Sequence, residues 1–212
     1  MLIARILYPI EVLGPGKRVG LWFCGCRHCC SGCSNPELWE FDDSKNISLS
    51  VLYDLLKALH RRKPVDGFTI TGGEPFDQED ELKELVMLLK NLSTDIIVYT
   101  GYTIGELLAK PSPAAKVILD TIAVLIDGPY IDELNNGVFL RGSANQQTRI
   151  LRDEYKSRYT EFLAKGTNQI QNFRINDREI VSVGIHKRNF KRDLSQSVEK
   201  YGLLEGVKPS LY

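Results

Sequence analysis

All five cysteines of this 212-residue chain fall within ten consecutive residues. They are Cys24, Cys26, Cys29, Cys30 and Cys33. Because no cysteine lies elsewhere in the sequence, a disulfide could not join distant parts of a fold, and the clustering indicates metal binding instead. Thiolates are soft ligands that suit an iron–sulfur cluster or zinc.

The spacing of the cysteines permits two sets of three ligands, either Cys26, Cys30 and Cys33 or Cys26, Cys29 and Cys33. Spacing alone does not choose between them. A structural zinc site normally takes four ligands, often in two separated pairs, and a compact version here would have to recruit His28 or a fourth cysteine. Three ligands on an iron–sulfur cluster would leave one iron open to bind a substrate.

Composition restricts the classes of partner. The chain is 43% hydrophobic and 25% charged with a formal net charge of +0, so neither a nucleic acid nor a membrane is an expected partner. No stretch approaches the length of a transmembrane helix, and the N-terminus lacks the apolar core and cleavage site of a secretory signal. We therefore expect a cytoplasmic protein.

Hydrophobic patterning predicts alternating strands and helices over the first two thirds of the chain. Strands are predicted over 2–12, 19–24, 67–71, 95–100 and 121–127, and helices are predicted to start at Ser48 or Ser50, at Asp77, and at Thr103, which forms a capping box with Glu106. The first helix is expected to bury Val51, Leu52, Leu55, Leu56 and Leu59, and the second Leu82, Leu85, Val86 and Leu89. Such alternation indicates an α/β fold, either an open parallel sheet or an incomplete (β/α) barrel.

Four of these predicted strands are followed immediately by residues that could bind a ligand. They are the cysteine loop, the segment Gly72 to Glu74, Thr100 and Asp127. Because the carboxyl ends of parallel strands meet at one edge of a sheet, the pattern predicts a single site there. A Thr or Asp at a strand end can equally cap the next turn, so Thr100 and Asp127 have that second interpretation.

The pattern changes near residue 151. We expect a core over 1–150 that carries the cysteine loop, and a C-terminal α+β appendage over 151–212 whose role the sequence does not indicate. The appendage is predicted to contain a charged helix over 150–164, a hairpin turning at Asn176 and Asp177, and a last helix starting near Asp193. The basic run over 186–192 is typical of a solvated face.

The segment GPGKRVGLWFCGCRHCCSGCSNP resembles the cluster segment of radical S-adenosylmethionine activating enzymes, whose pattern is GPG-x-R followed by GC-x3-C-x2-C-x-N. The resemblance implies a radical S-adenosylmethionine fold and selects Cys26, Cys30 and Cys33 as ligands of a [4Fe–4S] cluster. In this family the amino and carboxylate groups of S-adenosylmethionine chelate the open iron, and one electron from the reduced cluster breaks a carbon–sulfur bond, giving a 5′-deoxyadenosyl radical.

A second segment, TGGEP, is similar to the family motif that contacts the amino group of S-adenosylmethionine. The resemblance implies that Gly72, Gly73 and Glu74 lie at the methionyl group, and that the backbone of Gly32, Cys33 and Ser34 lies near the nucleoside. Many radical enzymes carry an aromatic residue at the position of Gly32. Thr100 and Asp127 are further candidates for contact with the cofactor.

The segments YTGY, VLIDGPY and LRGSANQ resemble the activating proteins of anaerobic ribonucleotide reductases, and this resemblance spans residues 1 to about 150. It implies that the radical takes a hydrogen atom from a backbone glycine of the partner reductase, with a small protein such as flavodoxin or ferredoxin as electron donor. Arg141 and Asn145 could bind the partner's glycine loop or simply hold their own segment. The appendage lies outside the resemblance, so radical modification of another protein, peptide or small molecule is an alternative, and a non-catalytic iron–sulfur or zinc module is a second.

Overall fold

A single six-stranded sheet forms the centre of the structure, a computed structural model that describes residues 1–176 and 179–200. Its strands are β1 (Ile3–Ile10), β2 (Arg18–Phe23), β3 (Gly67–Gly72), β4 (Ile96–Tyr99), β5 (Val124–Asp127) and β6 (Gln147–Ile150), and they lie in that order. The four strands from β2 to β5 are parallel, while β1 and β6 pair antiparallel at the two edges. The predicted α/β class with a mostly parallel sheet is confirmed.

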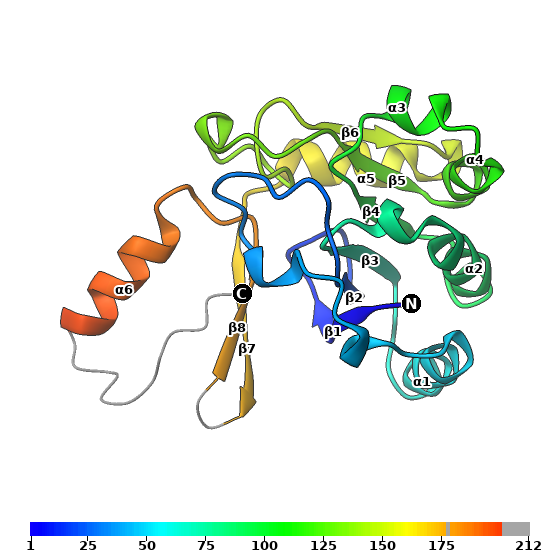
Figure 1. Ribbon diagram of the computed structural model, residues 1–212, viewed down its shortest axis with the longest axis horizontal. Helices are drawn as coiled ribbons and strands as arrows, with labels where there is room; N and C mark the ends of the chain where they lie inside the picture. The colour runs from blue at the N-terminus through cyan, green and yellow to red at the C-terminus, as the bar shows by residue number, and fades with distance from the viewer. Residues whose placement is uncertain (177–178, 201–212) are drawn as a thin grey trace.

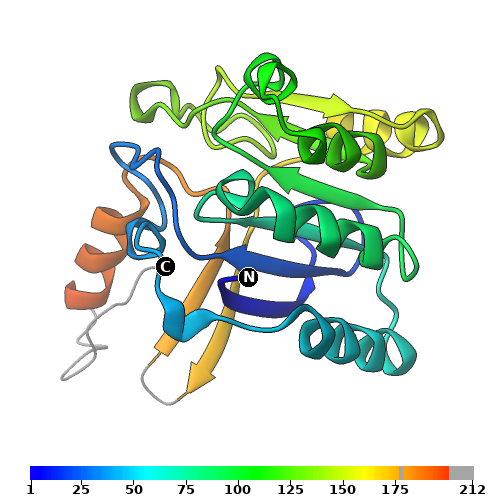
Figure 2. The same ribbon diagram turned by 45° about the vertical axis from the view of Figure 1, so that its right-hand side comes forward.

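The helices that connect the parallel strands cover one face of this sheet, and the C-terminal segment covers the other (Figures 1 and 2). The helices are α1 (Leu49–Arg62), α2 (Glu79–Leu89), α3 (Ile104–Ala109), α4 (Pro113–Thr121), α5 (Lys156–Lys165) and α6 (Phe190–Lys200), and a separate hairpin consists of β7 (Ile170–Asn176) and β8 (Glu179–Gly184). On β4, Ile96 and Val98 join the core beneath α1, α2 and α4, whereas Ile97 joins the cluster that contains Tyr159 of α5. Alternate side chains of one buried strand therefore hold both layers.

Helix α1 begins where the sequence predicts but buries a narrower face. The Ser48 hydroxyl accepts a hydrogen bond from the Val51 amide at 3.3 Å, which confirms Ser48 as the N-cap. Leu52 and Leu56 are buried, but Val51 and Leu55 are 60% and 50% exposed, so the prediction that they join the core is wrong. The core contacts of α1 come from a narrow stripe of residues three and four apart, namely Leu49, Leu52, Leu56 and Leu59, and Val51 and Leu55 lie beside this stripe.

Helix α2 begins later than predicted. The Glu74 side chain caps a short 3-10 turn, η3 (Pro75–Gln78), and α2 follows at Glu79. Asp77 is therefore not the cap: its carboxylate accepts hydrogen bonds from the Arg27 amide and the Tyr102 hydroxyl, both at 2.8 Å. The predicted core positions of this helix are all buried: Leu82, Leu85, Val86 and Leu89.

The predicted capping box of Thr103 and Glu106 is confirmed at the start of α3. Helix α4 and strand β6 were not predicted. The helix predicted over 150–164 starts too early, because Ile150 pairs with Val124 as the last residue of β6 and α5 begins only at Lys156. The segment that forms β6 is QTRI, which has no apolar run, so its strand conformation comes from pairing with β5 rather than from a local preference.

The predicted C-terminal hairpin and last helix are both present. Asn176 ends β7, and Asp177, the second predicted turn residue, lies outside the described residues. Helix α6 begins at Phe190, ahead of the predicted start near Asp193. Across the described ranges, none of the helices is both long and apolar enough to cross a membrane.

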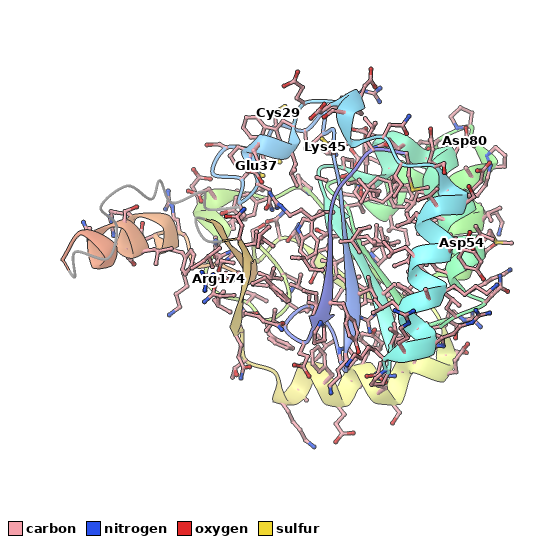
Figure 3. All side chains as sticks on the ribbon, turned by 90° about the horizontal axis from the view of Figure 1, so that it is seen from below. Cys29, Glu37, Lys45, Asp54, Asp80 and Arg174 are labelled. Atoms are coloured by element: carbon pink, nitrogen blue, oxygen red, sulfur yellow. The ribbon has the colours of Figure 1, made fainter. Side chains whose placement is uncertain are left out.

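A buried ionic network joins the sheet to α5 at the end remote from the cysteines. The fully buried Arg18 donates to the Asp95 carboxylate at 3.1 Å and to the Thr69 hydroxyl at 2.8 Å. From α5, the Tyr159 hydroxyl donates to the same carboxylate, and Arg158 forms an ion pair with it at 3.1 Å. Figure 3 shows α5 below the lower ends of the strands and the cysteine loop above their upper ends. Helix α5 packs against the face of the sheet opposite α1, α2 and α4. The division of the chain into 1–150 and 151–212 stays a prediction.

Candidate functional site

The cysteine loop follows β2, and three of its thiols line one pocket. Cys26, Cys30 and Cys33 belong to the lining, and each is half-buried. Cys24 is buried behind the loop, where its thiol donates to a backbone carbonyl at 3.0 Å. Cys29 is exposed, lies outside the lining, and is seen at the outer edge of the loop in Figure 3. The pocket thus contains the first of the two predicted ligand sets and only part of the second.

Partial burial affects the protonation of the pocket thiols. It raises the pKa of Cys26 to about 11 and also raises the pKa of Cys30. Metal ligation deprotonates a thiol, so these groups would release protons on binding iron. In the part of the chain that the structure describes, no three histidine, cysteine or carboxylate side chains converge on the position of a single metal ion. The three cysteines thus line one pocket without converging on a single point.

The glycines of the GGE turn allow the end of β3 to lie against the cysteine loop. Gly72 has φ +108°, and a Cβ there would lie 2.4 Å from the Phe23 nitrogen. A Cβ on Gly73 would lie 2.2 Å from the Gly25 oxygen. Backbone hydrogen bonds from Gly73 to Phe23 and from Glu74 to Gly25, both 2.8 Å, close this contact. Only glycine fits at these two positions, and the pocket lining includes both.

Glu74 lies at the centre of the strand ends and is 1% exposed. Its Oε1 accepts hydrogen bonds from the Thr100 hydroxyl at 2.8 Å and the Phe76 amide at 2.9 Å, and its Oε2 accepts one from the Gly101 amide at 2.7 Å. His28 Nε2 of the cysteine loop lies 3.6 Å from Oε2. Burial raises the pKa of Glu74 to about 7, against the opposing effect of these hydrogen bonds. The carboxylate therefore connects β3, β4 and the cysteine loop.

The two predicted strand-end contacts lie in different surroundings. Thr100 lines the pocket beside Glu74. Asp127 lies outside the lining: its carboxylate accepts from the Ile104 amide at 2.8 Å, which caps α3, and pairs with Arg149 at 2.7 Å. The Asp127 side chain thus has the capping interaction that a strand-end aspartate often makes, and its contact with a cofactor stays a prediction.

The requirement for glycine at position 32 comes from a contact outside the main pocket. It has φ +71°, and a Cβ would come 2.6 Å from Cγ of Asp132, which follows β5 in the short 3-10 turn η4 (Asp132–Leu134). The Asp132 carboxylate also accepts a hydrogen bond from the Tyr130 hydroxyl at 2.8 Å. Ser34 lines the main pocket, while Gly32 lines a second hollow next to it.

The pocket also holds side chains that sequence patterns did not indicate for cofactor binding. His28, considered only as a zinc ligand, lies there with Trp39 and Asn135. His28 Nε2, Trp39 Nε1 and Asn135 Oδ1 are buried polar atoms with no hydrogen-bond partner among the described residues. Buried polar groups normally have partners, so these three atoms fit a pocket that takes up a polar ligand. They lie in loops without periodicity, where a sequence carries no signal for them.

The RGSANQ segment is held by its own neighbours. Arg141 donates to the backbone carbonyl of Gln146, and the Asn145 amide donates to the carbonyl of Pro129 at 2.7 Å. Gln146 in turn binds the backbone of Gly128 at 2.9 Å and lines the pocket. Arg141 and Asn145 could bind the partner's glycine loop or hold their own segment. Their contacts with Gln146 and Pro129 are of the second kind, because they hold the segment against the loop after β5.

Comparison with known proteins identifies the family. Residues 12–149 match the model of the 4Fe–4S single cluster domain. The chain is 33% identical over 150 residues to the anaerobic ribonucleoside-triphosphate reductase-activating protein of Vibrio cholerae, which covers 66% of this chain and 92% of that protein. The protein of the same name from Escherichia coli K12 is 30% identical over 153 residues, 68% of this chain and 96% of its own length. That of Enterobacteria phage T4 is 32% identical over 146 residues, 66% and 89% respectively.

The chain belongs to the family of anaerobic ribonucleoside-triphosphate reductase-activating proteins. The resemblance found in the sequence is confirmed, and an iron–sulfur cluster is the cofactor that the matched domain implies. The family match ends at residue 149, so it includes the cysteine loop, the GGE turn and the RGSANQ segment. The α5 helix, the β7–β8 hairpin and α6 lie C-terminal to the matched residues.

Proposed function

We propose that this chain binds a [4Fe–4S] cluster through Cys26, Cys30 and Cys33 and cleaves S-adenosylmethionine reductively to generate a glycyl radical on a partner enzyme. The relatives are named for the anaerobic ribonucleoside-triphosphate reductase, and we propose the corresponding reductase as partner. The mostly parallel sheet would then be an incomplete barrel of the radical S-adenosylmethionine type. A small protein such as flavodoxin or ferredoxin would donate the electron in the cytoplasm.

The observation that carries this proposal is the composition of a single pocket. It brings together three cysteines of the loop after β2, the glycines of the turn after β3, and Thr100 after β4. Its unpartnered polar atoms on His28, Trp39 and Asn135 are suited to a ligand with both donors and acceptors. The alternative set through Cys29 would need an exposed thiol to turn inward.

The chain's own residues would hold and orient the ligands. Held by Cys26, Cys30 and Cys33 and reduced by the electron donor, a [4Fe–4S] cluster would have one open iron and would supply the electron that divides S-adenosylmethionine into methionine and a 5′-deoxyadenosyl radical able to take a hydrogen atom from the partner's glycine. Gly72 and Gly73 bring backbone close to the cysteine loop without side chains in the way. Glu74 joins the ends of β3 and β4 through its contacts to Thr100 and Gly101, so we expect its main role to be positioning.

The test is product formation by the reconstituted and reduced protein. We expect the wild-type protein to form 5′-deoxyadenosine and methionine from S-adenosylmethionine under anaerobic conditions. Cys30→Ala should lose the three-cysteine cluster and all cleavage, whereas the matched control Cys29→Ala should keep both. A fully loaded cluster that forms neither product would refute the enzyme proposal, and loss of cleavage in Cys29→Ala with retention in Cys30→Ala would overturn the ligand set.

Electron spin resonance then tests the partner. With an anaerobic ribonucleoside-triphosphate reductase from the same organism as substrate, we expect a glycyl radical doublet that depends on S-adenosylmethionine. If cleavage occurs and no doublet appears on that reductase, the substrate is instead another protein, a peptide or a small molecule.

A further inference from the structure

The appendage supplies one wall of the cysteine pocket. The lining includes the end of β8 and the loop after it: Ser182, Val183, Gly184, Ile185 and His186. Figures 1 and 2 show the β7–β8 hairpin lying against the face of the sheet that α1, α2 and α4 leave uncovered, with α6 beyond it. These residues follow the end of the family match at residue 149. This chain therefore completes its pocket with residues that the activating-protein domain does not contain.

Apolar contacts hold the hairpin in this position. Val181 and Val183 are 2% and 3% exposed and pack in one cluster with Ile10 and Trp22 of the sheet. The Gln171 side chain adds hydrogen bonds to the backbone of β1 and the residue after it, at 2.7 Å and 3.1 Å. Burial of two valines is worth about 3 kcal/mol or more, so the wall is a fixed part of the fold.

Polar contacts join the wall to the loop after β5. Arg188 donates to the Asp132 carboxylate at 2.7 Å, and the Asn135 amide donates to the backbone carbonyl of His186 at 3.0 Å. Asp132 is the residue that lies against Gly32 of the cysteine loop. Asp132 thus contacts both the wall and the cysteine loop, and it fixes the position of one relative to the other.

The chemistry facing the pocket has an apolar and a polar part. Val183 and Ile185 line it together with Trp22 and Leu13, which gives an apolar surface. Ser182 Oγ and His186 Nε2 form a hydrogen-bonded pair at 2.9 Å, and the unpartnered Oδ1 of Asn135 lines the same pocket. A nucleoside needs both parts, because its flat base packs on apolar surface while its ribose hydroxyls and ring nitrogens form hydrogen bonds.

We propose that Ser182 and His186 of the appendage, with Asn135, bind the nucleoside half of S-adenosylmethionine. The inference rests on the proposed function, since it takes S-adenosylmethionine as the ligand of the pocket. The methionyl half is then left to the GGE turn, and the backbone of Cys33 and Ser34 in the cysteine loop stays beside the nucleoside. The appendage is on this account a cofactor-binding element rather than a separate arm.

Binding to the cluster-loaded, unreduced protein tests the inference without any turnover. Isothermal calorimetry would measure the Kd of S-adenosylmethionine and of 5′-deoxyadenosine, which contains only the nucleoside half. We expect Ser182→Ala and His186→Ala each to weaken both ligands about 5- to 10-fold, the effect of losing one net hydrogen bond. The matched control is Asn172→Ala, because Asn172 pairs with Ser182 across the hairpin, is exposed, and lies outside the pocket lining. It should bind both ligands as the wild type does.

Iron and sulfide content and the thermal midpoint, measured on the same samples, separate a binding defect from loss of the fold. Unchanged affinities in both variants would overturn the inference, as would a loss restricted to S-adenosylmethionine with 5′-deoxyadenosine unaffected. Normal binding with impaired radical transfer would instead assign the wall to the partner protein and also overturn it. If the wild-type protein binds S-adenosylmethionine through these residues but does not cleave it on reduction, the proposed function fails and the inference stands.

Discussion

Replacing Arg18 by leucine tests the buried network at the foot of the sheet. Arg18 is 0% exposed and makes five hydrogen bonds through its guanidinium group, to Asp95 twice and to Thr69, Pro15 and Phe68. Leucine would leave these acceptors without their donor and the Asp95 carboxylate without its fully buried partner. Removing one member of a buried ion pair costs about 3–5 kcal/mol.

The expected readout is a lower thermal midpoint. A loss of ~3–5 kcal/mol corresponds to a decrease of roughly 6–20 °C for a chain of this size, at about 2–4 °C per kcal/mol. Arg18→Lys keeps the charge but has three donors in place of five in a planar fork, so its midpoint should fall between those of the leucine variant and the wild type. Circular dichroism at 222 nm and calorimetry would follow the transition.

The matched control is Arg61→Leu, the same chemical change on the exposed side of α1. A surface substitution of this kind should change stability by no more than about 0.5 kcal/mol. The reasoning is refuted if Arg18→Leu melts within about 2 °C of the wild type, a shift below the smallest that a 3 kcal/mol loss produces.

Two further predictions concern the site. Burial raises the pKa of Glu74 from 4.5 to about 7, so its contribution to stability is fully present below pH 4.5 and is lost as pH rises through 7. Relative to Glu74→Gln, the wild type should therefore lose up to ~3 kcal/mol of its free energy of unfolding between pH 4.5 and 8, as measured by urea unfolding. A difference in stability between the two proteins that stays constant over this pH range would contradict the prediction. Gly32→Ala should destabilise the protein by about 1–3 kcal/mol through its positive φ and its contact with Asp132, whereas Gly137→Ala has φ +80° with nothing within 4 Å and carries the backbone cost alone. Equal thermal midpoints for the two alanine variants would show that the Asp132 contact costs nothing.

The sequence alone predicts those parts of the site that depend on local pattern and on one rule of topology, the parallel pairing of neighbouring strands. Strand-length apolar runs ended at Cys24, Gly72 and Thr100, and parallel pairing brings such ends to one edge. The register that pairs Phe23 with Gly72 then sets the GGE turn beside the cysteine loop. The glycines are required by this contact between two segments, whereas the resemblance implies only that they lie at the methionyl group.

Other parts depended on contacts between segments far apart in the chain. Strand β6 forms because β5 offers an edge, and its own residues give no strand pattern. Asp127 follows its strand as predicted, but the nearby amide of Ile104 and the Arg149 guanidinium occupy its carboxylate. Ser182 and His186 enter the pocket only because the hairpin packs on Trp22. No local pattern contains such information.

The network around Arg18 has a consequence for how sequences of this kind are recognised. The GPG-x-R part of the family signature lies at the amino end of β2, and the cysteines lie beyond its carboxyl end, about 17 Å away along the strand. Its arginine, Arg18, lies away from the cysteine pocket. It donates hydrogen bonds to the Asp95 carboxylate and to the backbone carbonyls of Phe68 and Asp95 at the opposite end of the strands. The two halves of the signature therefore serve different parts of the molecule, the arginine the fold and the cysteines the pocket. A chain that keeps GPG-x-R without the cysteines would be expected to share this architecture but not the proposed cluster site.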